Sequence, residues 1–125
     1  MNILLIEDNQ SNADIFLQML RLHGYTQVVH KLSGVEGLRE ARSQAYDIIL
    51  IDFDLPDVHG TQIGLALATL MQKQRMKAAS LIALTAQSDK ASQANAERLG
   101  FDAFIGKPCL DSDLMDIIRQ VTTGA

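Results

Sequence analysis

Short, uninterrupted apolar runs recur along the chain and alternate with longer stretches of helical pattern. The runs occupy residues 3–6, 48–51, 80–84 and 101–105, and a weaker one covers residues 26–30. Their apolar residues are continuous rather than alternating, which is typical of strands that are buried on both faces of a parallel sheet. The pattern therefore predicts five such strands.

The stretches between the runs have the period of amphipathic helices. They cover residues 10–23, 33–43, 60–76, 88–99 and 111–122. In the first stretch, Phe16, Leu20 and His23 share one face and predict a stripe that faces the core. Ser33 is a predicted N-cap of the second. Strands and helices in alternation predict a doubly wound α/β fold, (βα)5, and residues 122–125 are expected to form a frayed tail.

Polar side chains stand at the ends of the predicted strands. The residues that follow four of the runs are Glu7, Asp8, Asp52, Thr85 and Lys107. Ligand sites of open parallel sheets lie at the carboxyl ends of the strands. We therefore expect these side chains to converge on one crevice.

Three crowded carboxylates repel one another and require a cation. Oxygen ligands suit Mg²⁺, so Glu7, Asp8 and Asp52 predict a magnesium site. A carboxylate can also attack phosphorus to form an aspartyl phosphate, and Asp52 needs no base because it is ionised at neutral pH. Lys107 would offset charge on the phosphoryl oxygens, and the Thr85 hydroxyl would donate a hydrogen bond to one of them.

Composition narrows the class of protein. The chain has 125 residues, which fits one domain, and its net charge of −4 argues against binding to nucleic acid or to an anionic membrane surface. No segment approaches the roughly 18 apolar residues that span a bilayer. The single cysteine, Cys109, excludes an intrachain disulfide and a Cys-based zinc site. We expect a cytoplasmic protein with one domain, residues 1–125, and no output domain.

Four motifs, taken together in this order and spacing, are similar to those of a known family. They are Leu5-Ile6-Glu7-Asp8-Asn9, Asp47-Ile48-Ile49-Leu50-Ile51-Asp52-Phe53-Asp54-Leu55-Pro56-Asp57-Val58-His59-Gly60, Leu84-Thr85-Ala86 and Phe104-Ile105-Gly106-Lys107-Pro108. Over essentially its full length the chain resembles the receiver domain of the two-component response-regulator family, in particular its stand-alone, chemotaxis-receiver-like members.

The resemblance implies a fold and a set of site residues. The fold would be flavodoxin-like, with a five-stranded parallel sheet in the order 2-1-3-4-5. Asp52 would be the phosphoacceptor, and Mg²⁺ would be bound by Glu7, Asp8, Asp52 and the backbone carbonyl of Asp54. The residues that bind the phosphate or switch with it would be Thr85, Ala86, Phe104 and Lys107. The peptide bond before Pro108 would be cis.

The resemblance also implies partners. A histidine kinase or a histidine phosphotransfer protein would supply the phosphoryl group from a phosphohistidine. A downstream protein would bind the face made of the fourth helix, fifth strand and fifth helix, with no direct contact to nucleic acid or membrane. The domain would catalyse only its own phosphorylation and dephosphorylation, so it is not expected to be an enzyme. Ile15, Met19 and Leu22 add a second apolar stripe to the first helix, which either widens the core contact or docks a histidine-containing partner.

One position and one short segment depart from the family pattern. Asp54 stands where the family usually has an aliphatic residue, Met or Asn, and we expect it, with Gln87 opposite, to tune the lifetime of the phosphoryl group. The run Asp57-Val58-His59-Gly60 replaces a segment that more often contains a Gly and a Met. We expect that change to alter only the loop.

Two other functions are compatible with parts of the sequence. The Asp52-Phe53-Asp54 segment matches the DxD opening of haloacid-dehalogenase-type phosphatases, but those enzymes need a later acidic pair, and here the pair comes earlier, at residues 7–8. Turnover of a generic phosphate ester would distinguish such an enzyme from a receiver. A pseudo-receiver that takes no phosphate is the other alternative, and the presence of every required residue argues against it.

Overall fold

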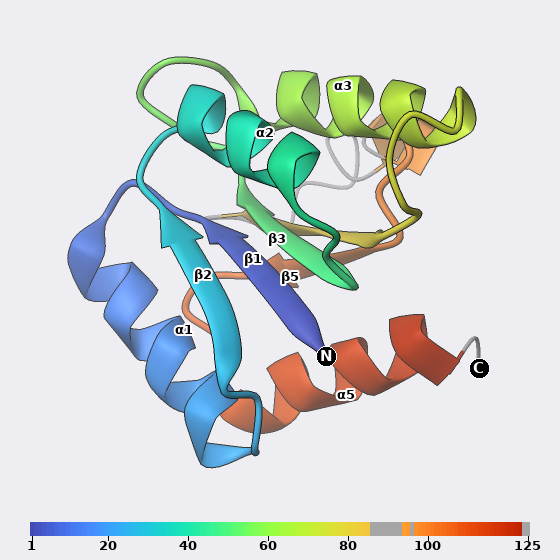
Figure 1. Ribbon diagram of the computed structural model, residues 1–125. Coiled ribbons are helices and arrows are strands. Elements are labelled where there is room, and N and C mark those ends of the chain that lie inside the picture. Colours follow the sequence, from blue (N-terminus) through green and yellow to red (C-terminus); the bar gives the residue numbers. More distant parts are fainter. Residues whose placement is uncertain (86–93, 96, 124–125) are drawn as a thin grey trace.

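The computed structural model describes residues 1–85, 94, 95 and 97–123. Within these residues, five strands form one parallel sheet in the order β2-β1-β3-β4-β5 (Figure 1), which confirms the flavodoxin-like, doubly wound fold. The helix predicted over residues 88–99 falls largely outside the described residues. The strands are β1 (Asn2–Ile6), β2 (Gln27–Lys31), β3 (Ile48–Asp52), β4 (Ser80–Thr85) and β5 (Ala103–Gly106), and the helices are α1 (Gln10–Leu22), α2 (Gly34–Ser43), α3 (Gly60–Gln72) and α5 (Asp111–Thr123).

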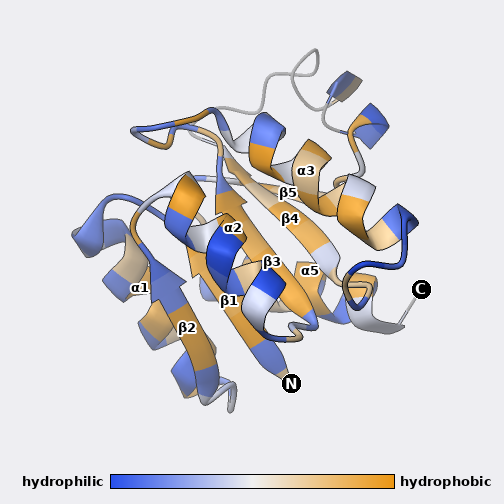
Figure 2. Cartoon of the chain, turned by 45° about the horizontal axis from the view of Figure 1, so that its top comes forward, coloured by the Kyte–Doolittle hydropathy of each residue, from blue (hydrophilic) through white to orange (hydrophobic). Residues whose placement is uncertain are grey.

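Helices cover both faces of the sheet, with α1 and α5 on one face and α2 and α3 on the other (Figure 1). Alternate side chains of a strand enter opposite clusters: Leu4 and Ile6 pack with α3, whereas Ile3 and Leu5 pack with α1. All five residues of β3 are buried. Figure 2 shows the hydrophobic positions concentrated along the central strands and hydrophilic ones along α2. Burial on both faces explains why the strands are continuous apolar runs in the sequence.

The first apolar stripe of α1 reaches the core only in part. Phe16 and Leu20 are buried, as their spacing predicts. His23 is not: it is the C-cap of the helix, and its Nε2 lies 3.1 Å from Oδ2 of the exposed Asp111. The prediction of a core-facing His23 is wrong, because the chain leaves the helix at this position and the imidazole reaches a carboxylate at the surface.

Two helix ends differ from the predicted ones. α3 ends at Gln72 rather than at residue 76, because Gln74 adopts a left-handed φ of 56° that closes the helix. α5 continues to Thr123, so the first two residues of the predicted tail are helical, and residues 124–125 lie outside the described ranges. None of the helices described here is long and apolar enough to cross a membrane.

Asp57, in the loop between β3 and α3, accepts hydrogen bonds from the backbone at the start of α2. Its Oδ1 accepts a hydrogen bond from the Gly34 N–H and its Oδ2 accepts one from the Val35 N–H, each at 2.9 Å. Partial burial acts to raise the pKa of Asp57, but these N–H donors hold it below its ordinary value. Ser33 occupies the predicted N-cap and accepts from the Glu36 N–H. The expectation that this segment alters only its own loop is therefore wrong, because Asp57 also caps α2.

Replacing Asp57 by alanine is expected to lower the free energy of unfolding by about 1 kcal/mol, the usual cost of a lost helix cap. Because the folded pKa lies below the unfolded one, this stabilisation is complete above the unfolded value of about 3.9 and is lost as the pH falls through the folded value. Urea unfolding of wild type and Asp57→Ala near neutral pH and in acid measures the difference. Asp14→Ala, at an exposed position of α1, is the control. A deficit of the same size in acid would contradict the role of the carboxylate.

Candidate functional site

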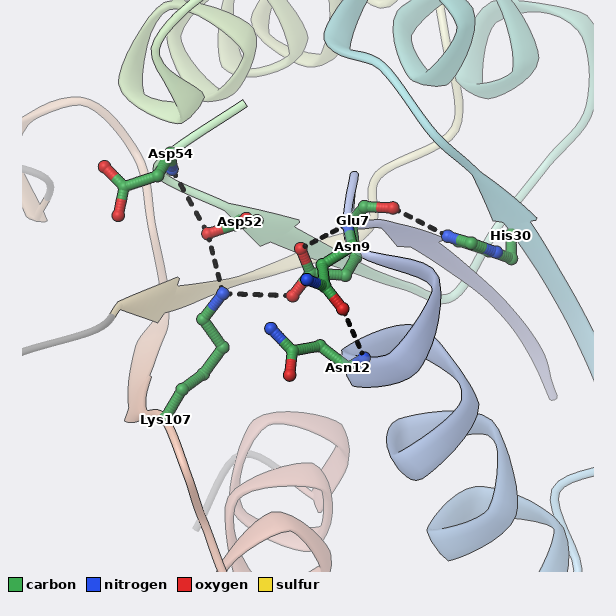
Figure 3. A network of polar contacts seen from close by, with 7 residues as sticks. All are labelled: Glu7, Asn9, Asn12, His30, Asp52, Asp54 and Lys107. Atoms are coloured by element: carbon green, nitrogen blue, oxygen red, sulfur yellow. Dashed lines mark hydrogen bonds and ion pairs between the residues drawn. The ribbon is translucent and has the colours of Figure 1, made fainter. Parts of the chain in front are cut away.

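The carboxyl ends of β1, β3 and β5 bring Glu7, Asp52 and Lys107 together (Figure 3). Lys107 Nζ lies 3.0 Å from Glu7 Oε1 and 3.1 Å from Asp52 Oδ1. The two acidic residues are almost completely buried, with exposed fractions of 0% and 1%. The parallel register produces this arrangement, because it aligns the carboxyl-terminal parts of neighbouring strands and pairs Ile6, the last residue of β1, with Ile51, the residue before the last in β3. Side chains that follow the strands therefore meet at one edge of the sheet.

Asp8 completes a group of three carboxylates. One oxygen each from Glu7, Asp8 and Asp52 lies within 4.8 Å of the others. Asp8 is the exposed member of the group, and the other two are buried. Clustered carboxylate oxygens with access to water are the ligand set that Mg²⁺ prefers. The residues present therefore fit the predicted magnesium ion.

Negative charge is crowded in this pocket. Burial, followed by the interaction with Asp52, raises the pKa of Glu7 to about 7, although Lys107 acts in the opposite direction. Burial by itself would lower the pKa of Lys107, but Glu7 and Asp52 raise it overall, so the ammonium group stays charged. One lysine offsets only part of the charge of three carboxylates, and the pocket therefore favours a further cation.

Thr85, the last residue of β4, has a hydroxyl group that makes no hydrogen bond within the described structure. The residue is 5% exposed, and its Oγ1 is buried without a hydrogen-bond partner among the described residues. A buried polar group that lacks a partner costs about 1–3 kcal/mol, so this hydroxyl is available to an acceptor that enters the pocket. The Thr85 carbonyl accepts the backbone N–H of Lys107 at 2.6 Å, which links the two residues.

The other predicted residues lie around this pocket or outside the described ranges. Phe104 in β5 is half-buried and packs against the hydrophobic cluster that includes α3. The Asp54 side chain is exposed, and its backbone N–H donates to Asp52 Oδ1 at 3.1 Å (Figure 3). The Lys107–Pro108 peptide bond is cis. Ala86 and Gln87 lie outside the described residues.

Two residues that the sequence analysis did not single out also shape the pocket. Gly60 begins α3 directly against β3, where a Cβ atom would clash with the Asp52 carbonyl oxygen. His30 in β2 places its Nε2 2.7 Å from the Glu7 carbonyl oxygen (Figure 3). The available signals were a glycine at a helix start and a histidine inside an otherwise weakly apolar strand. Neither signal reveals which atoms the residue approaches.

Comparison with known proteins identifies the class of protein to which this fold and this pocket belong. Residues 3–119 match the family model of the response regulator receiver domain. The chain therefore belongs to the receiver domains of two-component signalling. This membership favours the receiver interpretation over the phosphatase one.

Similar curated proteins include one of nearly the same length and two much longer ones. The polar-differentiation response regulator DivK of Brucella ovis is 30% identical over 119 residues, which are 95% of this chain and 94% of the relative. The hybrid signal transduction histidine kinases G and L of Dictyostelium discoideum are 31% and 30% identical over 96% and 94% of this chain. The chain spans only 4% and 7% of the length of these two kinases.

Two solved structures illustrate the similarity of the fold. A CheY-like receiver domain protein from Methanospirillum hungatei superimposes with a TM-score of 0.87 at 25% identity, covering 98% of this chain and 94% of that one. The receiver domain of a sensor histidine kinase from Pseudomonas aeruginosa PAO1 superimposes with a TM-score of 0.82 at 31% identity, covering 95% of this chain and 94% of that one. The Pseudomonas domain has a magnesium ion coordinated in its active site cleft.

Proposed function

We propose that this receiver domain accepts a phosphoryl group on Asp52 from a phosphohistidine of a sensor kinase or of a histidine phosphotransfer protein. The observation that carries the proposal is the buried Asp52 carboxylate, 3.1 Å from Lys107 Nζ and grouped with two further carboxylates. We propose that this transfer takes place in the cytoplasm, the location expected from the sequence.

The charges of the pocket account for the transfer. A carboxylate oxygen of Asp52 attacks phosphorus while the bond from phosphorus to the donor imidazole nitrogen breaks, and the bonding electron pair stays on that nitrogen. The Lys107 ammonium group, already in contact with Asp52, offsets the charge of the phosphoryl oxygens. The Thr85 hydroxyl, which has no partner in the described part of the chain, donates to one of these oxygens.

The proposed cofactor is Mg²⁺. Glu7, Asp8 and Asp52 would hold it together with the backbone carbonyl of Asp54. When bound, the ion offsets charge on the transferring phosphoryl group. The three-carboxylate group and the magnesium ion in the similar Pseudomonas domain support this assignment.

The proposed response to phosphorylation runs through Thr85 and Phe104. The phosphoryl group draws the Thr85 hydroxyl toward it, and the half-buried Phe104 turns inward into the space that is vacated. These changes bias the face formed by β5, α5 and the helix that precedes β5 toward one of two conformations. A downstream protein then binds this face in the favoured conformation.

The exposed stripe of α1 is the proposed docking site for the histidine-containing donor. Ile15 and Leu22 are 51% and 73% exposed, so these two residues do not widen the core contact, whereas the half-buried Met19 packs against it. Ile15 and Met19 line a hollow that also includes Lys107 and Pro108. A partner on this hollow would therefore lie beside the phosphoacceptor pocket.

Beryllofluoride, which mimics an aspartyl phosphate, tests the proposed function directly. With Mg²⁺ present, we expect it to shift the backbone amide NMR signals of Thr85, Phe104 and Lys107. Samples with the same Mg²⁺ and fluoride but without beryllium are the control. Unchanged signals would contradict the proposal and would favour the pseudo-receiver alternative.

Asp54→Asn is expected to lengthen the lifetime of the phosphoryl group about threefold to tenfold, less than the 10²-fold or more of a well-aligned general base. The proposed reason is that the exposed Asp54 carboxylate, two residues from Asp52 in the chain, takes a proton from the water that attacks phosphorus as the bond from phosphorus to the Asp52 oxygen breaks. Loss of the label after removal of the donor measures the lifetime. Glu36→Gln, which removes an exposed charge from the first turn of α2, is the control. A lifetime equal to that of wild type would show that Asp54 has no such role.

A further inference from the structure

His30 makes a hydrogen bond to the backbone beside the acidic group. It lies in β2 opposite Leu5, and its Nε2 is 2.7 Å from the carbonyl oxygen of Glu7 (Figure 3). A carbonyl oxygen can only accept a hydrogen bond. Nε2 must therefore carry the proton and donate it, in the neutral ring as well as in the charged one.

This hydrogen bond continues the β1–β2 ladder where the backbone of β2 no longer can. The Glu7 N–H donates to the Lys31 carbonyl at 3.1 Å. β2 ends at Lys31, and the chain then turns to Ser33, the N-cap of α2. Across the described ranges, no backbone N–H donates to the Glu7 carbonyl. The imidazole of His30 satisfies this carbonyl in place of a backbone donor.

As a result, Glu7 is held at four atoms. Its N–H and carbonyl are held by Lys31 and His30, its Oε1 by Lys107 Nζ at 3.0 Å, and its Oε2 by the Asn9 N–H at 3.3 Å. Asp8 differs from Glu7, because its side chain is exposed and no hydrogen bond fixes its carboxylate within the described structure. The direction of the Asp8 side chain thus depends on the peptide group that joins it to Glu7. That peptide group includes the carbonyl held by His30.

We propose that His30 is a positioning residue for the cation site: it orients the Glu7–Asp8 peptide so that the Asp8 carboxylate lies beside those of Glu7 and Asp52. This proposal rests on the proposed function, which places Mg²⁺ at these three carboxylates. Outer hydrogen bonds of this kind typically change metal affinity by about 10-fold to 100-fold when they are removed.

Mg²⁺ titration of folded protein, followed by calorimetry, tests the proposal. His30→Leu, which has no donor, is expected to raise the dissociation constant about tenfold. His30→Gln keeps a side-chain N–H and is expected to restore most of the affinity. His23→Leu removes a histidine from the far end of α1 and should leave the affinity unchanged. If His30→Leu only lost stability, its melting temperature would fall, but the folded protein would bind Mg²⁺ with the dissociation constant of wild type.

The outcomes distinguish this proposal from the function on which it rests. If wild type binds Mg²⁺ and His30→Leu binds it equally well, the positioning role is overturned. If wild type binds no Mg²⁺, the cation site of the proposed function fails, and the role of His30 fails with it. A second measurement needs no variant: ¹⁵N NMR of the histidine rings in neutral solution should show His30 protonated at Nε2. A His30 ring protonated only at Nδ1 would overturn the proposal even if the leucine variant does not fold.

Discussion

Asp52→Asn is expected to abolish phosphoryl uptake. The variant keeps the size and shape of the side chain, but an amide is a poor nucleophile and forms no stable acyl phosphate. It also removes one of the charges next to Lys107, which is 3.1 Å from Asp52 Oδ1. The measurement is the mass of the intact protein after incubation with Mg²⁺ and phosphoramidate, whose P–N bond resembles that of phosphohistidine. Wild type should gain one phosphoryl group and the variant none.

A matched variant separates the nucleophile from general effects of lost charge. Asp47→Asn removes a carboxylate that lies near the opposite end of the sheet, where it accepts from the Asn2 N–H and Lys77. We expect this variant to be phosphorylated like wild type. Phosphoryl uptake by Asp52→Asn at the wild-type level would show that another residue is the acceptor. In a separate experiment, phosphotransfer from candidate kinases to wild type and to Asp52→Asn would identify the donor.

Lys107→Ala is expected to have the second largest effect, on stability as well as on phosphorylation. The Lys107 side chain is 15% exposed and bridges the side chains of Glu7 and Asp52, whose exposed fractions counted without the backbone are 0% and 2%. Removing the partner of a buried charge typically costs about 3–5 kcal/mol, so the metal-free variant should unfold at lower urea concentration than wild type. Phosphoryl uptake should fall roughly a hundredfold, because one preorganised donor to the developing charge is lost.

Mg²⁺ and a second variant make the lysine experiment specific. The ion supplies positive charge to the same carboxylates, so it should recover more stability in Lys107→Ala than in wild type. Lys77→Ala breaks an ion pair at 3.1 Å between the exposed Lys77 and Asp47, whose side chain is 36% exposed, and should cost less than about 1 kcal/mol. If Lys107→Ala were as stable as wild type without metal, the lysine would not compensate the buried charges as argued.

The strand-end residues were the part of the site that sequence reasoning could locate. Glu7, Asp52 and Lys107 meet because each follows a short apolar run, and a parallel sheet brings the ends of such runs to one edge. Periodicity was less reliable at helix ends. His23 continued the apolar spacing of α1 and yet lies at the surface, because spacing does not show where the chain leaves the helix. The backbone of Gln74, with φ 56°, ended α3 for a similar local reason.

The sequence by itself determined the class of fold, the strands and the identity of the charged groups at their ends. These features are local, because continuous apolar runs and the residues directly after them follow from order along the chain. Only the tertiary structure decided that His30 donates to the Glu7 carbonyl and that Asp57 caps α2. Each of these contacts joins a side chain to a backbone group 22 or 23 positions away. Their existence depends on strand register and on the path of the loops, which no local pattern of hydrophobic and polar residues specifies.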